Sequence, residues 1–255
     1  MQPVIDLNCD AGESYGAYRI GQDDKVLPHV TSANIACGFH AGDPGVMRRT
    51  VQLCLVSHVA IGAHPGLPDL AGFGRRELRI TPEEAYEMTV YQIGALQAVV
   101  RAEGGGGLRH VKPHGALYNM AAADRPLADA IVRAVCAAAP EALLYGLAGS
   151  ELLLAAQAAG LPAVSEVFAD RRYRADGSLV PRHQDGAVLT DPEAVLAQAV
   201  RLAAAGEAET AEGAIIGVDA GTLCIHGDHP HAAEAAVRLR QRLEQEGITI
   251  RAPQR

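Results

Sequence analysis

The sequence predicts an α/β fold in which about seven strand–helix units make a closed or nearly closed βα barrel. Short apolar segments alternate with capped, amphipathic segments along the whole chain, and apolar strands of this kind indicate a parallel sheet covered by helices. The glycine fingerprint of a Rossmann unit is missing, which argues against an open doubly wound sheet. No low-complexity linker divides the chain, so we expect residues 1–255 to form a single barrel domain.

The composition limits the compartment and the partners of the chain. Hydrophobic residues make up 49% of the sequence, which is enough for a sizeable core, and the formal net charge is −8. A negative protein is repelled by nucleic acid and by anionic membrane surfaces, so we expect neither as a partner. The N-terminus lacks the pattern of a signal peptide, and no long uncharged apolar run occurs. We therefore expect a cytoplasmic protein with reduced cysteines.

Each of the first three predicted strands ends in polar residues that can do chemistry. The three segments are 4–8, 32–43, in which the apolar run ends at Gly38, and 59–69. The polar residues at or after their ends are, in order, Asp10 and Glu13, His40 and Asp43, and His64 and Asp69. The helices that follow begin with recognisable caps: the Asp43–Pro44 pair starts one, and Thr81 with Glu84 starts another that runs to about Glu103. Gly104–Gly107 precede a strand, so we interpret them as a connection and not a phosphate loop.

The second half of the chain continues the alternation. We expect helices over 124–139, 150–160, from 191 onward and up to 247, strands over 143–149, 163–174, 214–228 and 248–251, and a long excursion over 178–189. The strand at 163–174 is expected to present Glu166, Asp170, Arg171 and Arg172, and the strand at 214–228 to end in His226 and Asp228.

The segment LRHVKPHGALYN at 108–119 concentrates more chemistry than any other. Side chains two apart share one face of a strand, so His110, Lys112 and His114 can all point inward only while the strand lasts. Pro113 is expected to end it. Lys112 and His114 should therefore reach the mouth of the barrel, whereas His110 lies deeper and is structural.

The carboxyl ends of parallel strands meet at one face, so these side chains are expected to converge there. An aspartate with neutral imidazoles from separate strands suits a divalent metal that activates water, which makes Asp10, His64 and His114 a candidate metal site. Any one of these histidines, taken alone, is better explained as a hydrogen-bonded core or rim residue.

Two interpretations of Lys112 stay open. Burial can lower its pKa and make it a base, or it stays charged and holds an oxyanion, with an ion pair to Glu166 as the purely structural alternative. Two interpretations also stay open for four arginines. Each could bind a carboxylate or phosphate through two hydrogen bonds, or it could be a solvated charge on a loop. They are Arg75, Arg76, Arg171 and Arg172.

Five segments together resemble one family over nearly the whole chain. They are DLNCDAGE at 6–13, SANIACGFHAGDP at 32–44, GAHPGLPDLAGFGRR at 62–76, HVKPHGALYN at 110–119 and EVFADRRYRADGSLVPR at 166–182. In these motifs the chain resembles the LamB/YcsF family. The resemblance implies a seven-stranded βα barrel related to the glycoside hydrolase/deacetylase group.

The resemblance also implies an activity. Family members include one of the subunits of 5-oxoprolinase, which opens the lactam of 5-oxo-L-proline to L-glutamate with ATP hydrolysis and needs partner subunits B and C. Because the chain has no phosphate loop, ATP with Mg²⁺ must bind in another way or be shared with those partners. Whether the chain also forms a homo-oligomer is left open by the sequence.

Roles follow as hypotheses from that activity. Asp10 or His114 would activate water, Lys112 and His40 would stabilise the oxyanion, and Arg171 or Arg172 would hold the substrate carboxylate. Glu13 and Glu166 complete the expected substrate-binding set. The deacetylase relatives hold a metal with one aspartate and two histidines, which Asp10, His64 and His114 would match.

Two other classes of function compete with the lactam hydrolase. A metal-dependent deacetylase or carbohydrate hydrolase would work without ATP and bind stoichiometric zinc. A non-catalytic scaffold that binds a sugar or lactam would keep turnover in its complex when the strand-end histidines are changed.

Overall fold

The structure is a computed structural model, and it describes residues 2–182, 184–225 and 232–254. Along the chain its elements are β1 (Val4–Ala11), α1 (Asp23–Val26), the 3-10 helix η1 (Leu27–His29), β2 (Ser32–Ala36), α2 (Pro44–Val56), β3 (Ala60–His64), α3 (Pro82–Ala102), β4 (His110–Val111), α4 (Gly115–Ala123), α5 (Arg125–Ala138), β5 (Leu143–Leu147), α6 (Glu151–Ala159), β6 (Ala163–Phe168), α7 (Pro192–Ala205), β7 (Glu207–Glu209), β8 (Ile215–Gly217), β9 (Thr222–Ile225), α8 (Ala232–Gln245) and β10 (Thr249–Ile250).

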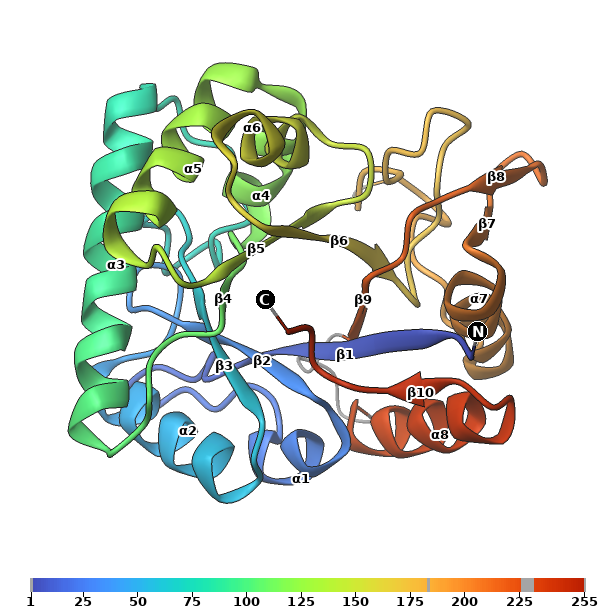
Figure 1. The fold of residues 1–255 in the computed structure, drawn as a ribbon, viewed down its shortest axis with the longest axis horizontal. Coiled ribbons are helices and arrows are strands. Elements are labelled where there is room, and N and C mark those ends of the chain that lie inside the picture. The colour runs from blue at the N-terminus through green and yellow to red at the C-terminus, as the bar shows by residue number, and fades with distance from the viewer. Residues whose placement is uncertain (1, 183, 226–231, 255) are drawn as a thin grey trace.

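The predicted barrel is confirmed and is closed. Seven parallel strands pair in the order β1-β2-β3-β4-β5-β6-β9, and β9 pairs with β1 to complete the ring. The short strand β10 pairs with the first residues of β1, and β7 with β8 forms a separate antiparallel hairpin. Figure 1 shows the helices arranged around the outside of this ring. None of the helices in the described ranges has the length and apolar composition needed to cross a bilayer.

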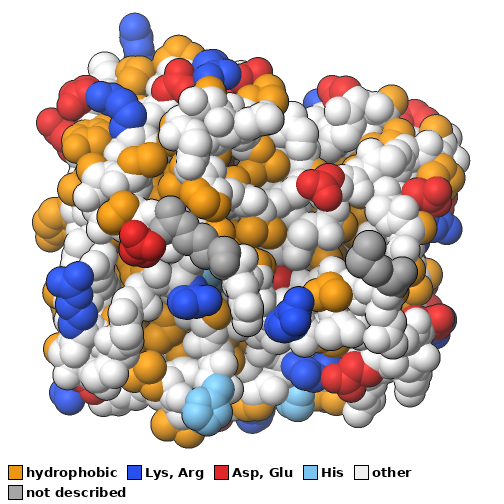
Figure 2. Space-filling view, viewed as in Figure 1, with side chains coloured by type: hydrophobic (Ala, Val, Ile, Leu, Met, Phe, Trp, Pro, Cys, Tyr) orange, Lys and Arg blue, Asp and Glu red, His pale blue; other side chains and the backbone are white. Residues whose placement is uncertain are grey.

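The C-terminal residues lie at the amino end of the barrel. Residues 251–254 line a cavity of about 840 Å³ together with residues that precede β2, β3, β4 and β5. Figure 2 shows this same face, on which basic, acidic and hydrophobic side chains are interspersed. The predicted catalytic side chains lie at the opposite end, where the strands terminate.

Strand β1 alternates strictly, which corrects the expectation of uniformly apolar strands. Its apolar residues, Ile5, Leu7 and Cys9 among them, belong to the main hydrophobic cluster. Its polar residues Asp6, Asn8 and Asp10 bond to side chains of other strands and so face the inside of the barrel. The strand is also longer than the predicted residues 4–8. Asp6 is therefore an ordinary inward-facing position.

The floor of the barrel is a buried carboxylate surrounded by hydroxyls. Asp6 accepts hydrogen bonds from Ser32 (2.8 Å), Tyr145 (3.0 Å) and Thr222 (2.6 Å). Burial raises the pKa of Asp6, and these donors offset part of that shift. The barrel core is therefore polar along its axis and apolar outside the strands, where the helices pack.

Several boundaries differ from the predicted ones. The strand expected over 163–174 ends at Phe168, because the chain there turns into a loop. The strand expected over 214–228 is two strands, β8 and β9, since the first pairs with β7 outside the barrel. Helix α4 was not predicted, because it begins at Gly115, inside the motif at 108–119. His226 and Asp228 lie outside the described residues.

The predicted helix starts are mostly confirmed. The side chain of Asp43 accepts from two backbone N–H groups, and Thr81 with Glu84 forms a complete capping box. Asp124 and Asp191 also cap with their side chains. Ser150 stands at the N-cap position but makes no side-chain cap bond.

A glycine on β3 tests the close packing of the barrel interior. A Cβ on Gly62 would lie 2.1 Å from His110 Nε2, whereas one on Gly94 in α3 meets nothing within 4 Å in the described chain. Gly62→Ala should lower the free energy of unfolding by about 1–3 kcal/mol through overpacking. Gly94→Ala should raise it by about 0.5–1 kcal/mol, since alanine favours a helix interior. Urea unfolding of both variants measures the difference, and equal effects would contradict this packing.

Candidate active site

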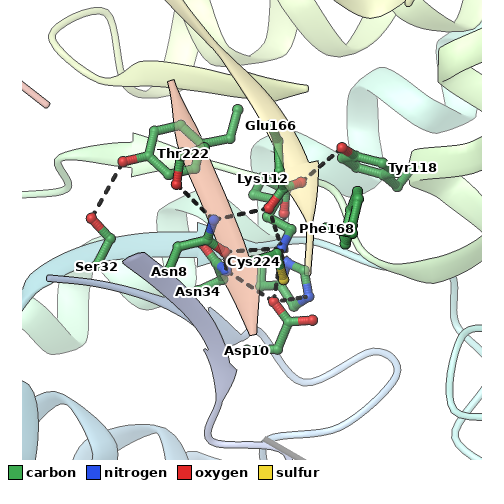
Figure 3. Close-up of polar contacts among 12 residues, drawn as sticks. Asn8, Asp10, Ser32, Asn34, Lys112, Tyr118, Glu166, Phe168, Thr222 and Cys224 are labelled. Atoms are coloured by element: carbon green, nitrogen blue, oxygen red, sulfur yellow. Dashed lines mark hydrogen bonds and ion pairs between the residues drawn. The ribbon is translucent and has the colours of Figure 1, made fainter. Parts of the chain in front are cut away.

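The ammonium of Lys112 is the centre of the polar cluster at the carboxyl ends of the strands. Its Nζ lies 2.7 Å from Glu166 Oε1 and 3.1 Å from Asp10 Oδ1, and it also donates to Asn8 Oδ1 (3.1 Å) and Cys224 Sγ (3.2 Å). Figure 3 shows these groups converging on Lys112 from β1, β6 and β9. Four strands that are far apart in sequence thus build one site.

These contacts decide between the two interpretations of Lys112. Burial alone would lower its pKa, but the charges of Asp10 and Glu166 oppose burial and hold the pKa of Lys112 well above its usual range. The side chain is therefore a permanent cation at neutral pH, which excludes the role of general base. It can stabilise negative charge.

A network of amides fixes this cation in place. Asn8 donates to Glu166 Oε1 (3.0 Å) and to Thr222 Oγ1 (2.7 Å), which turns its oxygen toward Lys112. Asn34 donates to Asn8 and to Asp10, and its own oxygen lies 2.7 Å from His110 Nε2. His110 is fully buried and stacks on Tyr145, with ring centroids 4.1 Å apart. The structure thus places His110 deep, below the mouth.

Glu166 is a partner of the cation and has little access to a ligand. It is fully buried, and its second oxygen accepts from Tyr118 OH at 2.7 Å. Asp10 differs, because its side chain keeps 12% of its surface exposed. Of the two carboxylates bound to Lys112, Asp10 is the one that a substrate can reach.

Three histidines and a glutamate form a second cluster beside Asp10. Ligand atoms of Glu13, His40, His64 and His114 all lie within 4.8 Å of one another, and all four residues are buried. Asp10 is not in this group, although its Oδ1 lies 3.4 Å from His64 Nε2. The structure therefore brings together five of the residues that the sequence singled out.

The histidines pack against glycines of the loop after β3. A Cβ on Gly66 would lie 2.4 Å from His40 Nδ1, and one on Gly74 would lie 2.7 Å from His40 Cβ and 2.9 Å from His114 Cδ2. Gly74 also has a positive φ of 64°. Only glycine fits either position, which explains the glycines of the motif at 62–76.

An ion pair within the same loop fixes the conformation of that loop. Arg76 binds both carboxylate oxygens of Asp69, which also accepts from the backbone of Gly72 at 2.9 Å. The hydrogen bonds from Arg76 lower the pKa of Asp69 to about 2. Arg76 and Asp69 are therefore structural, and they position the Phe73 carbonyl that lies 2.8 Å from His114 Nε2.

This ion pair predicts a defined pH dependence. A carboxyl whose pKa is depressed stabilises the fold above its unfolded pKa of about 4, and this contribution is lost as the pH falls toward about 2. Arg76→Ala should therefore be less stable than the wild type at neutral pH, and the difference should shrink between about pH 4 and about pH 2. Urea unfolding at a series of pH values measures it. A difference independent of pH would contradict the assignment.

The remaining arginines lie in different environments. Arg171 is buried and donates to the Val180 carbonyl at 2.6 Å, and burial together with the charge of Arg182 lowers its pKa to about 10. Arg75 is exposed, with its guanidinium 4.9 Å from the centre of the Phe73 ring. Arg172 is half-buried in the loop after β6. The Nε of Arg171 is buried and has no hydrogen-bond partner among the described residues.

A cavity adjoins this cluster at the ends of β6 and β9. Its volume is about 650 Å³, and its lining includes Asp170, Arg182 and Cys224. Much of its remaining lining comes from α7 and α8, which lie outside the barrel. Asp43 does not contribute to the site, because its side chain caps α2 and accepts from Gly16 N at 2.7 Å.

Sequence reasoning missed most of the residues that support the site. Asn8, Asn34 and Thr222 link the strands around Lys112, and Tyr118 binds Glu166. Gln198 of α7 donates to three carbonyls at the end of β6 and so shapes the loop that carries Arg171. The polar residues at alternate positions of β1 were the available signal for the first group.

Comparison with known proteins identifies relatives that match along the whole chain. The A subunit of 5-oxoprolinase from Bacillus licheniformis is 56% identical over 248 residues, which cover 97% of this chain and 98% of the relative. The protein of the same name from Bordetella pertussis is 57% identical over 252 residues, covering 99% and 100%. A crystal structure of a lactam utilization protein from Thermus thermophilus superposes with a TM-score of 0.92 at 49% identity, covering 98% of this chain and 100% of that one.

The family itself is shown by a direct match. The model of the LamB/YcsF family matches residues 5–255. That range contains every motif in which the sequence resembled this family, and the relatives of known name cover the same length. The chain therefore belongs to the LamB/YcsF family.

Proposed function

We propose that this chain is the A subunit of a 5-oxoprolinase and hydrolyses the lactam of 5-oxo-L-proline to L-glutamate together with partner subunits B and C. The names of its relatives and of the Thermus structure support a lactam hydrolase. The observation that carries the proposal is the pairing of the buried cation Lys112 with the partly exposed carboxylate Asp10, 3.1 Å apart. One group can stabilise negative charge, and the other can accept a proton from water.

The substrate explains why a partner that uses ATP is needed. A lactam is a resonance-stabilised amide, so water adds to its carbonyl carbon slowly. Transfer of the γ-phosphoryl group of ATP to the lactam oxygen would give an imidate-like species that water attacks readily. Water then bonds to the ring carbon, and the ring C–N bond breaks as the nitrogen takes up a proton, which leaves an acyl phosphate. A second water hydrolyses this acyl phosphate to L-glutamate and phosphate. The chain lacks a phosphate loop, so ATP and Mg²⁺ are assigned to the partners or to a site shared with them.

The residues of this chain take distinct roles in that step. Asp10 removes the proton from the attacking water, and Lys112 faces the developing negative charge. His40 can donate an N–H to the same oxygen, because neither of its ring nitrogens has a hydrogen-bond partner among the described residues. Arg171, with Arg172 nearby on the same loop, holds the substrate carboxylate. Glu166 keeps Lys112 charged, and His114 and Glu13 lie beside the water-activating group.

Reconstitution tests the proposal. Glutamate release from 5-oxoproline and ATP should be negligible with this chain alone and with the partner subunits alone, and full with both. Full activity of this chain alone would refute the need for partners. Release by the partners alone would refute a catalytic role for the barrel.

A second candidate function rests on the cluster of Glu13, His40, His64 and His114. Such a donor set suits a metal-dependent hydrolase that needs no ATP, such as a deacetylase acting on an acetylated sugar. Acetate release from an acetylated amino sugar, without ATP or partners, would favour this function over the first.

A further inference from the structure

The hydrogen bonds of two histidines fix where their protons lie. His64 Nδ1 lies 2.7 Å from the carbonyl oxygen of Lys112, and His114 Nε2 lies 2.8 Å from that of Phe73. A carbonyl oxygen only accepts hydrogen bonds, so each of these nitrogens must carry a hydrogen. A neutral imidazole has a single N–H, and in both rings it is now used.

The other two nitrogens of these rings face each other without a proton between them. His64 Nε2 and His114 Nδ1 are 2.9 Å apart. If both rings are neutral, both atoms present lone pairs, and two lone pairs at hydrogen-bond distance repel. Each ring contacts one carbonyl oxygen, and the two rings also contact each other, so three hydrogen bonds would need three protons. Two neutral imidazoles supply only two. A positive species must therefore lie between the rings, either a proton or a metal ion.

The surroundings favour a metal ion over a shared proton. Ligand atoms of Glu13, His64 and His114 lie within 4.8 Å of one another in buried surroundings, and a divalent ion can bind all three together, whereas a single shared proton cannot. A carboxylate stands close by, with Glu13 Oε1 3.7 Å from His114 Nδ1. Each imidazole is also oriented by a backbone carbonyl on its far nitrogen, which is the usual support for a metal-bound histidine.

We propose that His64 Nε2, His114 Nδ1 and the carboxylate of Glu13 hold a divalent transition-metal ion of the zinc class, with a fourth position open beside His40. Nitrogens 2.9 Å apart can both bind one ion at about 2.05 Å if the angle at the metal is about 90°. The site goes beyond the proposed lactam hydrolysis and does not depend on the identity of the substrate.

This set of ligands differs from the predicted triad of Asp10, His64 and His114. Asp10 Oδ1 already accepts from Lys112 and Asn34, whereas Glu13 lies within the compact group. His40 is not a ligand in this arrangement, because its ring is parallel to that of His114 with centroids 3.7 Å apart. The in-plane lone pairs of parallel rings do not point at one ion. His40 instead borders the open position, where water or a substrate oxygen would bind.

Zinc titration of the chain without partners or substrate tests the site. Untagged protein treated with EDTA and dialysed should bind one equivalent of Zn²⁺ in calorimetry, and Zn²⁺ should raise its melting temperature. Co²⁺ should give the visible absorption of a low-coordinate site with nitrogen and oxygen ligands. His64→Ala and His114→Ala should each weaken zinc binding at least 100-fold.

Two further variants separate loss of a ligand from loss of the fold. Glu13→Gln preserves the shape of the side chain and should weaken binding about 10- to 100-fold while circular dichroism stays unchanged. His58→Asn is the matched control: His58 is exposed and has a positive φ of 55°, which asparagine tolerates. It should bind zinc like the wild type. Absence of stoichiometric zinc, or equal binding in folded His64→Ala or Glu13→Gln, would overturn the site and leave a shared proton between the rings.

Discussion

Lys112→Met is expected to reduce glutamate formation by the reconstituted complex by about 10²–10³-fold, the usual effect of removing one group that stabilises an oxyanion. It should also lower the free energy of unfolding by about 3–5 kcal/mol, because Asp10 and Glu166 would remain in the barrel without their counter-charge. Steady-state glutamate release and urea unfolding measure the two effects.

The chain offers a matched control for this variant. Its only other lysine is Lys25, which is exposed on α1. Lys25→Met should change neither activity nor stability beyond about 0.5 kcal/mol. A folded Lys112→Met protein with wild-type activity would show that the cation does not take part in the reaction.

Asp10→Asn should lower kcat by about 10²–10⁴-fold, the range for loss of a general base. Asparagine keeps an oxygen that can accept from Lys112 and Asn34, so the fold and the KM for 5-oxoproline should change little. The free energy of unfolding should therefore fall in Lys112→Met but stay close to the wild-type value in Asp10→Asn. The exposed Asp24 provides the control, since Asp24→Asn removes the same charge from an exposed position of α1. A rise in KM at constant kcat would assign Asp10 to substrate binding instead.

The sequence predicted the barrel because its signals were local. Apolar strands followed by capped helices were visible in order, and the caps at Asp43 and Thr81 are present as expected. Closure could not be predicted, since it depends on the pairing of β9 with β1, whose residues are more than 200 positions apart. The rule that ligands gather at the carboxyl ends of parallel strands was enough to predict that Asp10, His64 and Lys112 meet.

The polar interior was harder to predict than the mouth. Asp6 and Asn8 point inward at alternate positions of β1 and bond across the barrel to Ser32 and Thr222. A period of two in residues 4–11 was the signal, and it is unusual in a strand that is buried on both faces. Partners such as Tyr145 carry no sequence signal, because their role appears only when β5 lies opposite β1.

Charges on loops could be assigned only from the structure. Arg75, Arg76, Arg171 and Arg172 look alike in the sequence, yet Arg76 binds Asp69 while Arg171 is buried. The difference comes from how each loop folds back on the barrel. Glu13 likewise joins the histidines only because the chain turns at Gly12, which has a positive φ of 69°.

The central claim is that the mouth of this barrel opens the lactam ring after the partner subunits have used ATP to activate it. Single-turnover measurement of ADP and glutamate in the reconstituted complex, with wild-type or Asp10→Asn chain, tests it most directly. We predict that Asp10→Asn complexes form up to one equivalent of ADP, dependent on 5-oxoproline, while glutamate appears about 10²–10⁴-fold more slowly. Glutamate formation at the wild-type rate by the Asp10→Asn complex would contradict the account.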